Sequence, residues 1–149
     1  MKNQLLKNVY YGNEIHELAQ GTESLRQWMR GSKDSPSFST DIPWNIIDQT
    51  IINFVSRRHE AVFGGQITAG DAAVIAAYMA AVRPTKMIEI GVASGFSSAF
   101  ILMMAKELEL TGNEPFLYSF DLVTATSAGQ KTGSLLVKDY PHLIQHWRL

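Results

Sequence analysis

The feature that most constrains the fold is the stretch "MIEIGVASGFSSAF" at residues 87–100. An apolar run typical of a strand stops at Gly91, meets a second glycine at Gly95 and continues as an amphipathic segment typical of a helix. Glycine permits a positive φ and a close approach of a ligand to the backbone. A strand that turns through two glycines into a helix indicates a parallel α/β sheet, in which ligands bind at the carboxyl ends of the strands.

The segments on either side repeat this alternation. We predict helices at 69–82, 94–109 and 134–140, strands at 86–91 and 116–121, and a third strand within 142–149. Thr68 and Asp71 form a capping box at the start of the first helix, and Pro84 follows its end. Gly112 is expected to end the second helix. The order predicts a Rossmann-like α/β fold, a parallel sheet of about three strands flanked by helices.

Two parts of the chain are expected. Residues 1–60 are predicted to be an N-terminal helical extension, with a short helix at 22–30 and a longer one that starts near Pro43. Residues 61–149 are predicted to be the cofactor-binding half of a Rossmann-like domain. The longer helix has apolar or long side chains at helical spacing, namely Ile47, Ile51, Phe54, Val55 and Arg58.

Composition excludes several classes of function. The chain has 13 Lys and Arg against 14 Asp and Glu and no basic run, which argues against a nucleic-acid partner. It has no cysteine, so disulfides, thiolate zinc sites and a cysteine nucleophile are excluded. Its apolar runs are too short to span a bilayer, and its first residues lack the apolar core of a signal peptide. We therefore expect no membrane association and a cytoplasmic location.

The glycines and acids narrow the ligand. The P-loop pattern is absent, and Ala93 and Ser94 replace two glycines of the dinucleotide fingerprint, which leaves NAD as a weaker alternative. Glu89 precedes the turn, and Asp121 ends the second strand. A carboxylate at that strand end can accept hydrogen bonds from ribose hydroxyls. Acids beside the turn disfavour a pyrophosphate and suit a nucleoside that carries positive charge.

With these residues, "EIGVASGFSS" and "YSFDLV" resemble the class I S-adenosylmethionine-dependent methyltransferases. The preceding "GGQITAGDAAVIAAYMAAVRPTKMIEIG" resembles the entry segment of their small-molecule O-methyltransferase branch. The resemblance covers roughly residues 64–123. It implies a doubly wound α/β domain with S-adenosyl-L-methionine as the cofactor.

The resemblance also implies a cofactor site. Gly91 and Gly95 would lie under the methionine part, and Asp121 would hold the ribose with Leu122 beside the adenine. The implied cofactor-binding residues are Glu89, Gly91, Ser94, Gly95, Ser97, Asp121, Leu122, Gln66 and Ile67.

For four of these residues, the resemblance specifies the contact with the cofactor less closely. The hydroxyls of Ser94 and Ser97 would reach the methionine carboxylate, although Ser94 can equally be a helix cap. Gln66 and Ile67 stand where the family often adds cofactor contacts.

The predicted function is methyl transfer from S-adenosylmethionine to a small-molecule acceptor, at oxygen. No catalytic residue and no metal ligands are identified, because in the resembling family these groups come from the fourth strand and later loops. His142 and His146 are spaced as two ligands of a metal would be, but the only acidic third ligand nearby is Asp139. The sequence does not exclude a divalent metal.

Because only three strands are predicted, we expect an incomplete domain that is inactive alone. The alternative function is a non-catalytic or truncated S-adenosylmethionine- or nucleoside-binding module. The outer edge of the first strand would be bare. It would be covered by a second copy, a missing C-terminal half or the N-terminal helices.

Overall fold

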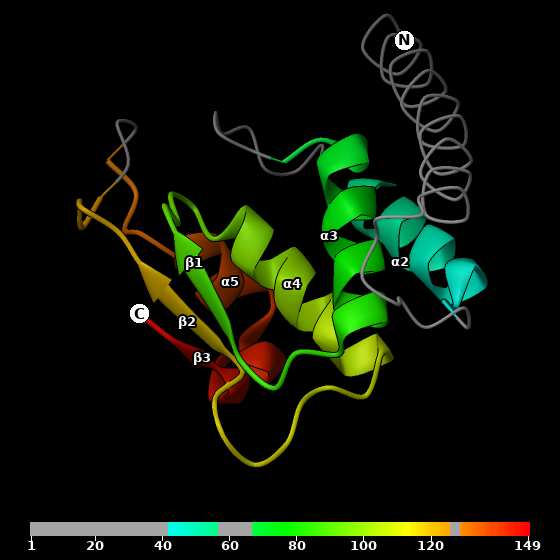
Figure 1. Cartoon of the computed structure of the whole chain (residues 1–149). Coiled ribbons are helices and arrows are strands. Elements are labelled where there is room, and N and C mark those ends of the chain that lie inside the picture. Colours follow the sequence, from blue (N-terminus) through cyan, green and yellow to red (C-terminus); the bar gives the residue numbers. More distant parts are fainter. Residues whose placement is uncertain (1–41, 57–66, 126–128) are drawn as a thin grey trace, which may run out of the picture. The chain divides into compact units, whose positions relative to one another are not determined.

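The computed structural model describes residues 42–56, 67–125 and 129–149 (Figure 1). The chain divides into two compact units, Met1–Arg57 with Thr68–Val82, and Arg58–Ile67 with Arg83–Leu149. The first, here called the helical unit, contains α2 (Trp44–Ser56) and α3 (Ala69–Val82). The second, here called the sheet unit, contains the three strands that the described residues form. Whether the predicted boundary near residue 60 separates two domains stays a prediction.

The helical unit is formed by packing of α2 against α3. Helix α2 starts directly after Pro43, whose carbonyl accepts the N–H of Ile47, and its predicted apolar side is buried through Ile47, Ile51 and Phe54. The buried side of α3 consists mainly of alanines. Small side chains let two helix backbones approach closely, so an alanine-rich helix suits this contact.

The predicted capping box and bounds of α3 are confirmed. The Thr68 N–H donates to Asp71 Oδ2 at 2.9 Å, and the Asp71 N–H donates to Thr68 Oγ1 at 3.1 Å. The helix ends at Val82, as Pro84 predicts. Arg83 takes a left-handed conformation with φ of 47°, which stops the helix before the proline.

The sheet unit has three parallel strands in the order β1-β2-β3. They are β1 (Met87–Ile90), β2 (Leu117–Phe120) and β3 (Trp147–Arg148). Helix α4 (Phe96–Glu107) connects β1 to β2, and α5 (Ser134–Asp139) with the 3₁₀ helix η2 (Pro141–His146) connects β2 to β3. The predicted alternation of helices and parallel strands is confirmed.

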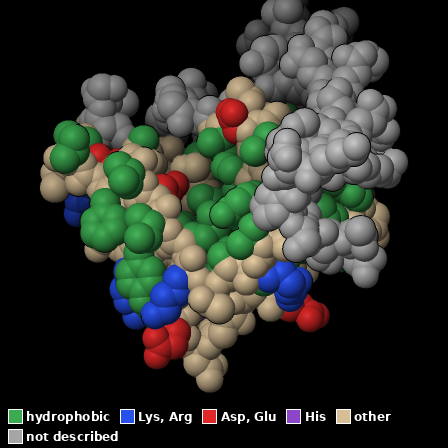
Figure 2. Space-filling model, in the orientation of Figure 1, with side chains coloured by type: hydrophobic (Ala, Val, Ile, Leu, Met, Phe, Trp, Pro, Cys, Tyr) green, Lys and Arg blue, Asp and Glu red, His purple; other side chains and the backbone are tan. Residues whose placement is uncertain are grey.

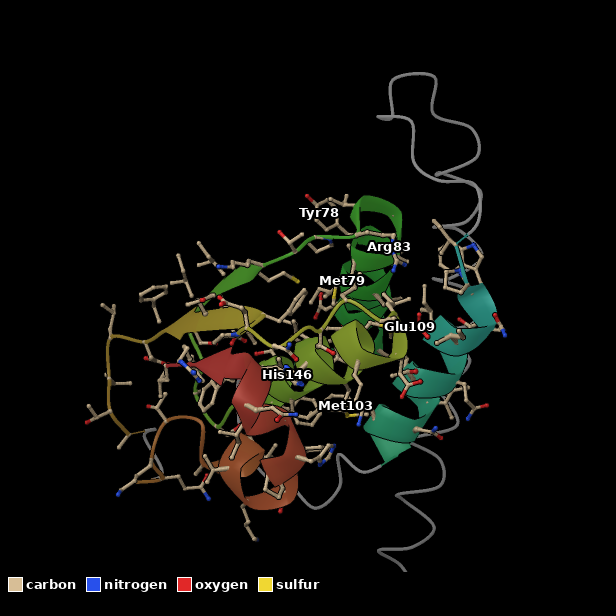
Figure 3. The ribbon with its side chains drawn as sticks, turned by 90° about the horizontal axis from the view of Figure 1, so that it is seen from below. Tyr78, Met79, Arg83, Met103, Glu109 and His146 are labelled. Atoms are coloured by element: carbon tan, nitrogen blue, oxygen red, sulfur yellow. The ribbon has the colours of Figure 1, made fainter. Side chains whose placement is uncertain are left out.

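The strands and helices of the sheet unit form two layers. Figure 3 shows the strands on one side and α4, α5 and η2 on the other. Side chains alternate between the faces of a strand. The helix-side face of β1 and β2 carries Glu89 and Ser119, which are buried, whereas Ile88 and Ile90 on the opposite face are exposed. The five residues predicted for the inner side of this helix are buried: Phe96, Phe100, Ile101 and Met104 in α4, and Leu108 at its C-cap.

Two sequence predictions need correction. Gly112 does not end α4, because the helix stops at Glu107 and the left-handed position is filled by Glu109, with φ of 56°. Arg83 then supplies a side-chain donor for the helix end, since its Nη2 donates to the Leu108 carbonyl at 3.0 Å. Figure 3 labels Arg83 and Glu109.

The predicted third strand is much shorter than the segment 142–149. Pro141 starts the 3₁₀ helix η2, and only Trp147 and Arg148 pair with β2. Proline fixes φ near the helical value and favours the first position of a helical turn. This local preference defers the extended backbone to the last residues.

Several predicted features lie outside the described residues, namely the helix at 22–30, Arg58 and Gln66. Within the described ranges, no helix has the length and apolar character needed to cross a bilayer.

Candidate functional site

The candidate site is built on the turn between β1 and α4, residues 91–95, here called the glycine turn. Three of its residues have left-handed backbone: Gly91 with φ of 86°, Ala93 with 47° and Gly95 with 89°. The Gly91 N–H donates to the Phe120 carbonyl at 2.8 Å, and the Gly95 N–H donates to the Val92 carbonyl at 2.8 Å. The turn is therefore fixed to the end of β2 at one end and closed on itself at the other.

The two predicted glycines face different surroundings. A Cβ at Gly91 would meet no atom within 4 Å, so the backbone there is open to an approaching group. A Cβ at Gly95 would lie 3.0 Å from the Cα of Gly133 and 3.3 Å from the Cβ of Leu136. Gly95 therefore permits close packing of α5 against the turn, while Gly91 leaves space for a ligand.

Asp121, at the end of β2, holds the glycine turn from the side. Its Oδ2 accepts the N–H groups of Val92 at 2.8 Å and Ala93 at 3.0 Å, and its Oδ1 accepts the N–H of Val123 at 3.0 Å. These backbone donors, with Ala93 first and then Val123 and Val92, lower the pKa of Asp121 below its ordinary value. A carboxylate has about four acceptor positions, and these backbone donors occupy most of them.

Glu89 is buried on the helix-side face of β1 and is satisfied by three serine hydroxyls. Its Oε1 accepts from Ser97 Oγ at 2.5 Å. Its Oε2 accepts from Ser98 Oγ at 2.6 Å and from Ser119 Oγ at 2.7 Å. Taking a carboxylate out of water is costly unless it gains such hydrogen bonds. The acid therefore binds the first turn of α4 to β1 and β2.

The same network extends to β3 through Trp147. Its Nε1 donates to Ser119 Oγ at 2.8 Å, so this hydroxyl receives one hydrogen bond and donates another to Glu89. The Trp147 ring lies over Gly133, where a Cβ would stand 2.4 Å from Cη2. Gly133, with φ of 73°, caps α5 and is the residue that lets the indole pack there.

The start of α5 is bound to the glycine turn by its backbone. The Gly133 N–H donates to the Ala93 carbonyl at 2.9 Å, and the Leu135 N–H donates to the Ser94 carbonyl at 2.9 Å. The Ala93 and Ser94 carbonyls therefore point at the start of α5, while the Val92 and Ala93 N–H groups point at Asp121.

The predicted site residues are distributed unevenly over this geometry. Gly91 is exposed, Asp121 is half-exposed, and Leu122 is 102% exposed beyond the end of β2. Ser94 is buried, and Ser97 is half-buried with its hydroxyl on Glu89. Ile67 is half-exposed and belongs to the segment before α3.

Sequence reasoning missed Ser98, Ser119, Gly133 and Trp147. Ser119 carried a signal, because a serine in the apolar run "FLYSF" would need a polar partner if it faced the core. Gly133 carried one as well, since it precedes a helix in the same way as Gly95. The Trp147 contact joins segments distant in the sequence, and no local pattern predicts it.

No group of three or more His, Cys, Asp or Glu side chains that could hold a metal occurs among the residues that the structure describes. His146 lies in η2, where its Nε2 is 3.1 Å from Gln145 Nε2.

Comparisons with protein-family models, with curated proteins and with solved structures find no match for this chain.

Proposed function

We propose that the sheet unit binds S-adenosyl-L-methionine as the cofactor-binding part of a methyltransferase with a Rossmann-like fold that acts on a small-molecule oxygen in the cytoplasm. The observation that carries the proposal is the open backbone at Gly91 beside the tip of a parallel neighbouring strand. The carboxyl ends of parallel strands are where such sheets bind ligands.

The residues at the tip of β2 fit a nucleoside. The backbone donors leave Asp121 little acceptor capacity for a ribose hydroxyl, less than the two bonds that the family resemblance implies. Leu122 is 102% exposed and offers an apolar surface for an adenine ring. Gly91 provides the close backbone approach.

Glu89 and Ser97 have a supporting role in this proposal. Their side chains bond each other on the helix side of the sheet, so they fix the start of α4 and the exit of β1. Gly95 and Ser94 likewise place the turn against α5. The ligand-facing set then consists of Gly91, Asp121 and Leu122.

The charge at the turn favours a cationic ligand over a dinucleotide. A pyrophosphate needs free backbone N–H groups at the glycine turn. Those of Val92 and Ala93 are taken by the Asp121 carboxylate, whose negative charge also repels an anion. A sulfonium is compatible with the same carboxylate. NAD is thus the weaker candidate.

When bound, S-adenosylmethionine supplies a methyl group that is transferred from its sulfonium to a nucleophile. The chain's contribution is to hold the nucleoside at the tips of β1 and β2 in a fixed orientation. No residue is assigned as the base that removes the acceptor's proton.

Calorimetric titration tests the proposal, with S-adenosylhomocysteine and NAD as separate ligands. We expect the first to bind and the second to bind at least about tenfold more weakly. Leu122→Asp should weaken S-adenosylhomocysteine binding about tenfold or more, because it removes the apolar surface beside the adenine. Val137→Asp, which changes an exposed residue of α5, is the matched control.

Tighter binding of NAD, or no binding of S-adenosylhomocysteine, would contradict the proposal. The non-catalytic alternative is separated by turnover. A chain that binds the cofactor but transfers no methyl group to a panel of small hydroxylated acceptors, even with its natural partner polypeptides, is a binding module.

A further inference from the structure

The carboxylate at the tip of β2 is already bound by backbone groups of the chain itself. Asp121 Oδ2 accepts the N–H groups of Val92 at 2.8 Å and Ala93 at 3.0 Å, and Oδ1 accepts that of Val123 at 3.0 Å. Backbone hydrogen bonds from Ala93, Val123, Val92 and, last, Leu122 lower the pKa of this carboxyl below its ordinary value. With about four acceptor positions in all, Asp121 has little capacity for a further donor.

The second acid of the site, Glu89, does not offer another acceptor for a ligand. It is only 8% exposed, and its two oxygens accept three serine hydroxyls on the helix-side face of the sheet. A ligand hydroxyl would have to displace one of these bonds and leave a buried serine without a partner. Such a loss is costly, so Glu89 is committed to the packing of α4 on the strands.

The backbone acceptors next to Asp121 also have partners within the chain. The Phe120 carbonyl accepts the Gly91 N–H at 2.8 Å, and the Val123 carbonyl accepts Thr132 Oγ1 at 2.7 Å. Each carbonyl keeps one lone pair, which can accept one neutral hydrogen bond. That is much weaker than the pair of charge-assisted bonds that a free carboxylate gives to two neighbouring hydroxyls.

The side chains that are exposed at the ends of β1 and β2 are mainly apolar. They include Ile90, Phe120, Leu122 and Val123. Figure 2 shows hydrophobic side chains gathered over β1 and β2. The tip of β2 therefore presents an apolar surface and one negative charge, and it presents few acceptors that a pair of sugar hydroxyls can use.

We propose that Asp121 is a positioning residue of the cofactor site, which holds the glycine turn and does not bind the sugar diol of the ligand. The inference rests on the proposed function. The site then recognises a nucleoside by its base, which contacts the apolar surface at Leu122, and by its positive charge, which the ionised Asp121 attracts. Its ligand class includes nucleosides whose 2′- or 3′-hydroxyl is absent or substituted.

The backbone donors have an advantage over a ribose diol in binding Asp121. The strand register and the glycine turn already hold the N–H groups of Val92 and Ala93 in place, whereas each ligand hydroxyl has to be immobilised. Release of Asp121 to the ligand would also leave these two N–H groups without their acceptor, and Val92 is buried. Asp121 therefore stays with the turn when a nucleoside binds.

Calorimetric titration with S-adenosylhomocysteine and with its 2′,3′-dideoxy analogue tests the inference. The wild-type chain should bind both with Kd values within about threefold of each other. Two hydrogen bonds from the diol to a carboxylate would make the difference about hundredfold or more. Asp121→Asn should weaken both ligands by the same factor, about tenfold, because the turn loses acceptor oxygens and the site loses its charge. Asp139→Asn, at an exposed position in α5, is the control and should leave both Kd values unchanged.

Amide hydrogen exchange of the free chain gives a second test that needs no ligand. The amides of Val92 and Ala93 should be protected in the wild type and should exchange at least about tenfold faster in Asp121→Asn. The amide of Leu102, in the buried part of α4, should keep its protection in the same variant. That comparison separates a local release of the turn from a general loss of folding.

The outcomes distinguish this inference from the proposed function. A loss of more than about threefold for the dideoxy analogue in the wild type would overturn the inference. Disappearance of that loss in Asp121→Asn would identify Asp121 as the group that binds the diol. If S-adenosylhomocysteine does not bind, the proposed function is wrong, and hydrogen exchange alone decides whether Asp121 holds the turn. Unchanged exchange of Val92 and Ala93 in Asp121→Asn would overturn the inference whether or not a ligand binds.

Discussion

Asp121 shows how one side chain can shape a loop that is distant in the sequence. Its carboxylate accepts hydrogen bonds from the N–H groups of Val92 and Ala93, and so supplies these backbone donors with a partner. A charged acceptor that receives several backbone N–H groups is stabilised in its ionised form. The conformation of the turn and the ionisation of Asp121 are therefore linked.

This linkage predicts a pH dependence of stability. The pKa of Asp121 is lowered below its ordinary value of 3.8, so its ionised form stabilises the fold above that pH, and this contribution is lost as the pH falls through the lower folded-state value. Asp121→Asn should reduce the urea midpoint at pH 7. The difference from the wild type should narrow below about pH 4, where the wild-type carboxylate protonates.

Asp139→Asn, at an exposed position in α5, is the control for the loss of one negative charge. If the Asp121→Asn difference stayed the same between pH 7 and pH 3, the turn would not depend on the ionised carboxylate.

At this scale the sequence predicts positions better than contacts. Asp121 was predicted at the end of the second strand, where it lies. Its bonds to the N–H groups of the glycine turn could not be predicted, because they depend on the strand register and on the left-handed Ala93. Glu89 was predicted just before the turn, but its three serine partners come from α4 and β2 and depend on the packing of these elements.

At the scale of elements, the packing of α5 depends on the absence of a side chain at Gly133. Trp147 occupies the space where a Cβ would project, and the φ of 73° is strained for any other residue. Gly129 has a similar φ of 76° but open space around it. Substitutions at the two glycines therefore distinguish the free-energy cost of the left-handed backbone from that of a steric clash with Trp147.

Gly129→Ala should destabilise the chain by about 1 kcal/mol, from the left-handed backbone alone. Gly133→Ala should cost this amount and about 1–3 kcal/mol more, because the methyl group overlaps the indole. Urea unfolding followed by circular dichroism measures both. Equal effects of the two substitutions would show that Trp147 does not pack on Gly133.

The elements were predicted well where local chemistry marks their ends. The capping box and Pro84 gave α3 its bounds, and glycines marked the start of α4. The end of α4 was mispredicted because Glu109 adopts a left-handed conformation that glycine usually takes. The shortness of β3 was also beyond prediction, since it depends on where η2 places the chain against β2.

At the scale of the whole molecule, a buried polar network connects the elements of the sheet unit. Trp147 of β3 donates a hydrogen bond to Ser119 of β2, and Ser119 donates one to Glu89 of β1. Glu89 also accepts hydrogen bonds from serines of α4. Such a network fixes the order of the three strands and the position of α4 against them, because each polar group has its partner only in this arrangement.

Ser119→Ala should therefore destabilise the chain by about 1–3 kcal/mol, since it leaves the buried Trp147 Nε1 without an acceptor. Equilibrium urea unfolding measures the loss, and the tryptophan emission of the folded protein should change with it. Ser134→Ala, at a half-exposed position in α5, is the control. An unchanged unfolding midpoint for Ser119→Ala would show that the indole finds another acceptor.

The whole-molecule arrangement was predictable only in its order. Alternating helices and strands predicted the parallel sheet. The grouping of α3 with α2 in one compact unit, rather than with the strand that follows it, has no local signature. It depends on which apolar surfaces meet, and several pairings satisfy the same periodicity.

The hydrogen bonds by which Asp121 holds the glycine turn have a consequence for ligand recognition. A loop already held in shape loses little conformational freedom when a molecule arrives, so association should be fast and should leave the backbone nearly unmoved. Selectivity would then depend on whether a ligand is compatible with the negative charge of Asp121, and not on a change in the conformation of the loop from one ligand to another.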